Sequence, residues 1–152
     1  MAFSEVSADI ISQFEVIVGP VNTIIDPSKR YDYSHDETED HSFLPDVVLQ
    51  PGSAEEISLI MKLCNEHGIP VTPRGGGTGL SGGALPVEKG VVISMGRFNK
   101  ILNIDELNLQ ATVESGVITQ VFQNVVKDKR LFYPPDPASR GSCFIGGNVS
   151  EN

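Results

Sequence analysis

The chain has few of the residues that would place it in several large classes of protein. Its 152 residues include only two cysteines, Cys64 and Cys143, which match neither a metal-ligand motif nor a disulfide framework. Lysine and arginine number 11 against 20 aspartates and glutamates, so the formal net charge is −9. Because nucleic-acid binding depends largely on Lys and Arg contacts to phosphates, this deficit argues against a nucleic-acid partner.

Long apolar runs and early basic residues are also missing. No uninterrupted apolar run approaches the roughly 18 residues that suggest a membrane span. The first basic residue is Lys29, so the positively charged start of a secretory signal is absent. We therefore expect a soluble, cytoplasmic protein without a membrane span, and leave open that the native-length protein associates peripherally with a membrane. The three histidines, His35, His41 and His67, are isolated, so we predict neither a metal site nor a catalytic histidine.

The first third of the chain predicts a helix followed by a polar connection. Residues 4–18 carry a helical pattern of apolar residues that ends at Gly19-Pro20. Residues 26–46 are polar and acidic, and no complete set of metal ligands is spaced within them. We interpret this stretch as a solvated connecting segment.

A β-α-β unit is predicted next. Val47–Gln50 has the composition of a short buried strand, and Ser53 with Glu56 three residues later forms a capping box that starts a helix. Gly68 ends this helix and opens a second strand over residues 68–72. Strand, helix and strand in this order predict a parallel, right-handed unit. The apolar residues of the helix fall on one face: Ala54, Ile57, Ile60, Met61 and Cys64.

Six glycines lie within residues 73–83, directly after the second strand of that unit. Glycine adopts positive φ without strain, and successive backbone N–H groups aimed into one concavity bind anions. The loop follows a parallel strand at its carboxyl end, where open α/β sheets bind ligands. Since the net charge of the chain repels anions, such local dipoles suit a phosphate ligand. The sequence therefore predicts a phosphate-binding loop.

Three other interpretations of the glycine loop are weaker. Residues 77–82 match the G-x-G-x-x-G of nicotinamide-binding folds, but that motif must open a helix. Here Gly83-Ala84-Leu85-Pro86 follows, and the chain soon enters a strand at Val91–Ser94. A Walker loop would need Gly-Lys-Ser/Thr at its end, which is missing. A loop that only turns the chain needs one or two glycines rather than three in succession.

The remainder of the chain predicts an antiparallel region. Two apolar segments, residues 101–104 and 109–113, form a hairpin pattern, and Thr119 precedes a helix. Basic residues in its last turn suit the helix dipole. We expect this region to be unfinished at Asn152. The apolar face of the helix is predicted to consist of Val121, Phe122, Val125 and Val126.

The glycine loop resembles a known family when it is taken with two later motifs that we also expect to be loops, Pro135-Asp136-Pro137-Ala138-Ser139 and Gly146-Gly147-Asn148. Together they resemble the FAD-binding domain, of p-cresol methylhydroxylase (PCMH) type, of the vanillyl-alcohol oxidase flavoproteins. Within that family the likeness is to the D subunit of glycolate oxidase and to D-lactate dehydrogenases. The resemblance implies an α+β fold with a small parallel β-α-β subdomain and a mainly antiparallel one. FAD is expected to lie between them.

The resemblance also implies the residues that bind FAD. The first loop wraps the pyrophosphate with Arg74, Gly75, Gly76, Gly77, Thr78, Gly79, Ser81 and Gly82. A second set lines the cofactor further toward the flavin: Pro135, Asp136, Ser139, Gly146, Gly147 and Asn148. For Arg74 a salt bridge that packs the loop is an equal alternative, and for Asp136 a bond to its own backbone in a turn is another. Where some relatives carry a histidine bonded to the flavin, this chain has Thr78, so non-covalent binding is expected.

As a function, the resemblance implies oxidation of a D-2-hydroxy acid such as glycolate or D-lactate to the 2-oxo acid, with FAD as the hydride acceptor. A non-catalytic flavin- or nucleotide-binding module is the alternative. We expect a connecting region over residues 1–46, a first subdomain over 47–94 and a truncated second subdomain over 95–152. The chain alone is expected to be inactive and to hold FAD weakly. No catalytic residue is assigned, and an electron-transfer partner subunit is anticipated.

Overall fold

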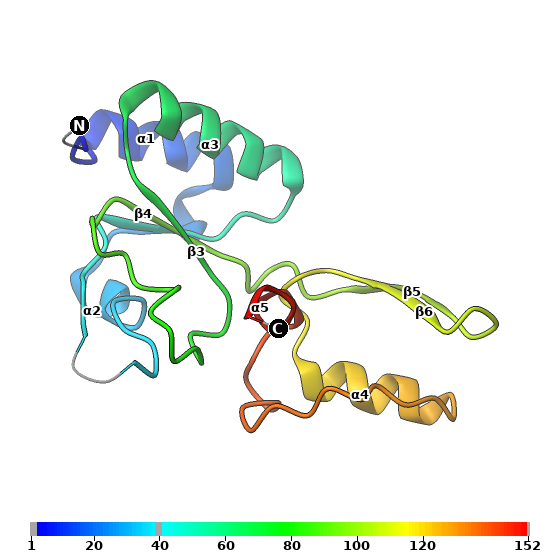
Figure 1. Cartoon of the computed structure of the whole chain (residues 1–152). Coiled ribbons are helices and arrows are strands. Elements are labelled where there is room, and N and C mark those ends of the chain that lie inside the picture. The colour runs from blue at the N-terminus through cyan, green and yellow to red at the C-terminus, as the bar shows by residue number, and fades with distance from the viewer. Residues whose placement is uncertain (1–2, 39–40, 152) are drawn as a thin grey trace.

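A four-stranded sheet covered by two helices forms the first part of the fold (Figure 1). The structure is a computed structural model that describes residues 3–38 and 41–151. The strands lie in the order β1-β2-β4-β3, and β1 alone runs antiparallel to its neighbour. Their bounds are Thr23–Ile24 for β1, Val47–Leu49 for β2, Val71–Arg74 for β3 and Val91–Ser94 for β4.

The predicted β-α-β unit is confirmed, with one addition to its topology. Strands β2 and β3 are parallel, but β4 lies between them and pairs with both. The connecting helix α3, Ala54–His67, begins where Ser53 Oγ accepts a hydrogen bond of 3.2 Å from the Glu56 N–H. It ends at Gly68, whose φ of 65° is left-handed. Local sequence signals thus fix both ends of this helix.

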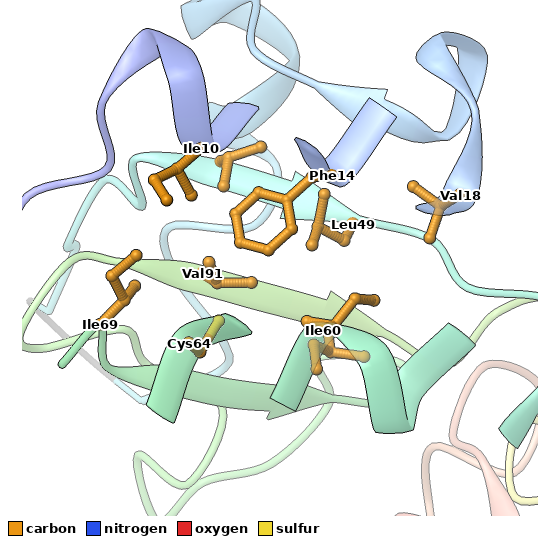
Figure 2. Packing of buried hydrophobic residues seen from close by; sticks show 10 residues of the cluster. Ile10, Phe14, Val18, Leu49, Ile60, Cys64, Ile69 and Val91 are labelled. Atoms are coloured by element: carbon orange, nitrogen blue, oxygen red, sulfur yellow. The ribbon is translucent and has the colours of Figure 1, made fainter. Parts of the chain in front are cut away.

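The main core lies between the sheet and helices α1 (Ala8–Val18) and α3, which contact each other on one face of the sheet. Figure 2 shows Phe14 of α1 pointing toward Leu49 and Val91 of the sheet. Ile60 and Cys64 of α3 complete this cluster. Met61, which the sequence pattern places on the same face, is 45% exposed, because one residue beyond Ile60 the helix has turned about 100° away.

A smaller second part follows, and its hairpin is confirmed. Strands β5 (Ile101–Asp105) and β6 (Gln110–Val113) pair antiparallel, and helices α4 (Thr119–Asp128) and α5 (Ile145–Glu151) accompany them. Phe122 and Val126 of α4 are buried, whereas Val121 is 48% exposed and does not belong to the predicted face. Together with the parallel sheet, this hairpin and its helices make the fold α+β.

Two expectations for this second part are wrong. Thr119 does not cap α4 from outside: it is the first residue of the helix, and its buried hydroxyl lies 3.3 Å from Cys143 Sγ. Residues 146–148 belong to helix α5 rather than to a loop. Glycine disfavours helix formation, so tertiary packing of α5 outweighs the local preference.

An open, largely apolar cavity of about 650 Å³ lies between the hairpin, α4 and α5, lined among others by Val113, Phe122 and Val149. The short remaining helices are α2, Pro27–Tyr31, and a 3-10 turn over Pro20–Asn22. Across residues 3–38 and 41–151, no helix is long and apolar enough to cross a membrane.

Candidate functional site

The glycine loop, defined here as residues 75–83, leaves the carboxyl end of β3 and passes close to α5. Ser81 Oγ donates a hydrogen bond of 3.0 Å to Glu151 Oε2 at the end of α5. On its other side the loop contacts residues 36–38, since the Glu37 N–H donates to the Gly79 carbonyl at 3.1 Å. The loop is therefore held between an early segment and the last helix of the chain.

The backbone of the glycine loop presents a row of free donors. Among the residues that the structure describes, none accepts a hydrogen bond from an N–H of residues 75–81. The next N–H, that of Gly82, donates to Thr38 Oγ1 at 3.0 Å. Gly77 has a φ of 71°, which glycine adopts without strain. Successive N–H groups without a protein partner are what the predicted anion-binding loop requires.

Arg74 lies buried beneath this loop. Only 7% of the residue is exposed, and its guanidinium sits 5.6 Å from the centroid of the Tyr33 ring. Its Nη2 donates to the Asp32 carbonyl at 3.1 Å, and a side chain at Gly77 would collide with the guanidinium. Its Nη1 is buried without a partner among residues 3–38 and 41–151. Burial lowers the pKa of Arg74, while the charge of Asp36 opposes that shift.

Two interpretations of Arg74 followed from the sequence, a contact to the pyrophosphate and a salt bridge that packs the loop, and neither alone describes it. It makes no salt bridge within the described parts of the chain, yet it packs the loop through Tyr33 and Gly77. Its free Nη1 is a charged donor that fits an anion held at the loop.

The segment over residues 26–46 is largely exposed, as its composition predicts, but three of its described residues are buried. Asp36 is 8% exposed, and Ser34 and Pro45 are buried. Asp36 Oδ1 accepts a hydrogen bond of 2.9 Å from the Thr38 N–H, and Arg30 Nη1 donates to the Pro45 and Asp46 carbonyls. Several polar groups of this segment are thus bonded to the protein, whereas Asp36 Oδ2 and Arg30 Nε are buried without a partner among the described residues. Residues 39–40 lie outside the described chain.

The segment between the two later motifs adjoins the glycine loop through residues 142–144. A Cβ added to Gly76 would lie 2.5 Å from the Ser142 carbonyl oxygen, and one added to Gly75 would lie 3.6 Å from the Phe144 ring. Glycine at position 76 is therefore needed for two backbones to approach. Sequence analysis did not single out Phe144 for the site, and no local pattern marks it.

The two glycines of helix α5 differ in their surroundings: Gly146 is closely packed and Gly147 faces open space. The Gly146 N–H donates to the Ser115 carbonyl at 2.8 Å, and a Cβ there would lie 2.7 Å from Ser115 Cβ. A Cβ at Gly147 would meet nothing within 4 Å. Asn148 Nδ2 donates to Thr119 Oγ1 at 2.6 Å, so this amide ties α5 to α4. Only Gly147 leaves open space beside the helix.

The residues predicted nearer the flavin lie against α4. The Pro135 carbonyl accepts a hydrogen bond of 2.8 Å from Gln123, and the Ser139 carbonyl accepts from the Ser142 and Cys143 N–H groups. Asp136 forms an exposed ion pair of 2.5 Å with Arg140 instead of bonding its own backbone. Within residues 3–38 and 41–151, no hydrogen bond joins residues 135–139 to the glycine loop.

Comparison with known proteins identifies the family. A family model described as an FAD binding domain matches residues 45–152. The chain belongs to this FAD binding domain family. It is 44% identical over 147 residues to "Glycolate oxidase subunit GlcD" of Bacillus subtilis (strain 168), covering 97% of this chain and 31% of that protein. It is 36% identical to a "D-lactate dehydrogenase" of Anaerostipes hadrus, covering 99% of this chain and 31% of that protein.

A solved structure supports the same assignment. The crystal structure of p-cresol methylhydroxylase with substrate bound matches 80% of this chain and 24% of its own, with 25% identity and a TM-score of 0.71. The family resemblance drawn from the glycine loop and the two later motifs is thus confirmed, and FAD is the cofactor of the domain. The chain spans about a third of the length of the curated relatives it matches.

The residues present fit FAD. A diphosphate needs several hydrogen-bond donors, and the N–H groups of residues 75–81 and Arg74 Nη1 are donors without a partner among the described residues. The open space at Gly147 leaves room for a bound group beside α5.

Glycines 76 and 147 should respond differently to alanine because one packs against backbone and the other faces open space. Gly76→Ala is expected to lower the free energy of unfolding by about 1–3 kcal/mol, as overpacking does. Gly147→Ala in helix α5 should raise it by up to about 1 kcal/mol. Urea unfolding of both variants tests this. A Gly76→Ala variant as stable as the parent would contradict the close backbone approach.

Proposed function

We propose that this chain is the FAD-binding part of an oxidoreductase that converts a D-2-hydroxy acid, of glycolate or D-lactate type, into the 2-oxo acid. The observation that carries the proposal is the row of free N–H groups over buried Arg74 in a member of the FAD binding domain family. The substrate class is supported by the names of two relatives, a glycolate oxidase subunit and a D-lactate dehydrogenase.

In this proposal the glycine loop holds the pyrophosphate with Arg74 and the backbone of Gly75–Gly79, together with Ser81 and Gly82. Fixed N–H dipoles compensate phosphate charge without an added cation, which suits a chain of net charge −9. Gly147 leaves open space for the part of FAD nearer the flavin. When bound, FAD accepts the hydride equivalent of the substrate. The subdomain bounds 47–94 and 95–152 remain predictions.

Other members of the predicted flavin-side set have structural bonds of their own. Asn148 is bonded to Thr119 and Asp136 to Arg140, and Gly146 packs on Ser115. We propose that they position α5 and its neighbouring loop while Pro135 and Ser139 lie toward the cofactor. An electron-transfer partner subunit is proposed by analogy with the relative named as a subunit. Catalytic residues are not assigned, because the chain spans 31% of each of these relatives.

Alanine at Gly79 tests the pyrophosphate position. Its Cβ would have no protein atom nearer than 4.0 Å, so the fold accommodates it, whereas Gly77 has positive φ and abuts Arg74. We expect Gly79→Ala in the native-length protein to weaken FAD binding at least about tenfold, because the added methyl group takes up space in the loop that is proposed to surround the phosphates. The measurement is calorimetric titration of the cofactor-free protein.

Gly141→Ala is the matched control for that titration, since a Cβ at Gly141 also meets nothing within 4 Å and the residue lies outside the proposed site. It should bind FAD like the parent. Equal affinities for Gly79→Ala and Gly141→Ala would remove the glycine loop from the site.

Oxidation of a D-2-hydroxy acid is tested by anaerobic reduction of the bound flavin. D-lactate or glycolate should bleach the flavin absorbance of the native-length protein, and L-lactate should do so far more slowly. Parallel assays with an artificial electron acceptor report turnover. A stably bound flavin that no hydroxy acid reduces would favour the non-catalytic binding module instead.

The attachment of FAD is expected to be non-covalent, since Thr78 occupies the loop position at which some relatives carry a flavin-bonded histidine, and its hydroxyl is a poor nucleophile at neutral pH. Precipitation of the native-length protein with acid should therefore release yellow flavin into the supernatant. Flavin that stays with the pellet through washing in denaturant would show a covalent bond.

A further inference from the structure

Residues 36–38 contact the glycine loop through a short chain of hydrogen bonds. Asp36 Oδ1 accepts from the Thr38 N–H at 2.9 Å, which closes a tight turn. From this turn the Glu37 N–H donates to the Gly79 carbonyl at 3.1 Å, and Thr38 Oγ1 accepts from the Gly82 N–H at 3.0 Å. The turn thus fixes the glycine loop on both sides of Leu80 and Ser81, over a sequence separation of more than 40 residues.

Two opposite charges lie under the same loop. Asp36 Oδ2 and Arg74 Nη1 are both buried, and neither has a hydrogen-bond partner among the described residues. A Cβ at Gly79 would lie 4.0 Å from Asp36 Oδ2, and one at Gly77 would collide with the Arg74 guanidinium. The carboxylate therefore sits below Gly79 and the guanidinium below Gly77. Burial of a charge is unfavourable unless another charge or a ligand compensates it.

We propose that Asp36 is a positioning residue for the glycine loop. Its carboxylate holds the 36–38 turn that fixes Gly79 and Gly82, and it compensates buried Arg74 from below. The N–H groups of residues 75–81 then stay directed toward the pyrophosphate. The inference rests on the proposed function only in taking the ligand of the loop to be the FAD pyrophosphate.

A purely electrostatic role for Asp36 makes the opposite prediction for affinity. If the carboxylate only subtracted positive potential from the site, its neutralisation would strengthen the attraction of Arg74 for phosphate. If it positions the loop, the same change weakens binding because the donors lose their fixed direction. The sign of the change in affinity therefore separates the two roles.

The experiment compares Asp36→Ala and Thr38→Val with the control Glu37→Gln. Alanine removes both the charge and the acceptor of the turn, whereas asparagine would keep the acceptor. Glu37→Gln removes the same charge one residue away, from an exposed side chain. Backbone order of residues 75–82 is measured by ¹⁵N relaxation in the cofactor-free 152-residue chain, and FAD affinity by calorimetry in the native-length protein. Urea unfolding checks that each variant folds. If Asp36→Ala does not fold, Thr38→Val carries the test, since it keeps both buried charges.

We expect order parameters near about 0.85 in the parent and below about 0.6 in Asp36→Ala and Thr38→Val. FAD binding should weaken about tenfold in both, with Glu37→Gln like the parent. Unchanged loop order, tighter FAD binding in Asp36→Ala, or an equal effect of Glu37→Gln would overturn the proposal. If the parent binds no FAD, the proposed function fails, and the order parameters still decide whether Asp36 positions the loop.

Discussion

The burial of Arg74 beneath the glycine loop is the interaction on which the site depends. Arg74 is the last residue of β3 and pairs in register with Ser94 of the central strand, so the parallel sheet fixes where its side chain begins. The guanidinium then lies against Tyr33 and occupies the space next to Gly77. Because the guanidinium fills that space, position 77 has no room for a side chain. The loop therefore passes over the charge of Arg74, whose backbone is held by the sheet.

Glycines, which lack a Cβ atom, allow close packing near the junction between the two parts of the fold. Gly76 lets the loop approach the Ser142 carbonyl, Gly146 lets α5 approach Ser115, and a Cβ at Gly116 would collide with the Met95 carbonyl. Gly76 and Gly116 thus meet backbone carbonyls, and Gly146 meets the Cβ and the carbonyl of Ser115, which leaves little freedom to adjust. The parallel sheet and the hairpin region are thereby held together where FAD is proposed to bind.

Local sequence signals predicted the elements whose ends are marked by capping residues. Contacts between residues distant in sequence determined the other elements. Ser53 and Gly68 mark the ends of α3 because capping is decided within one turn of the chain. The proposed role of Asp36 could not be predicted, because Gly79 and Arg74, near which it is buried, are distant in sequence and a cluster of acidic residues ordinarily indicates solvent exposure. Residues 146–148 carry two glycines and indicate a loop, yet contacts with Ser115 and Thr119 hold them in a helix.

An acidic chain that binds an anion must do so through geometry rather than through net charge. The negative charge of Asp36 acts on the buried positive charge of Arg74 and partly offsets it. In the proposed site a pyrophosphate is attracted by the N–H dipoles of residues 75–81, which have no partner among the described residues, and by the buried Nη1 of Arg74. The direction of these dipoles depends on how well ordered the glycine loop is. In this proposal, contacts with residues 36–38 and 142–144 on either side keep the loop ordered. Affinity for the cofactor is therefore tied to the packing around the loop as closely as to the residues that would contact the phosphates.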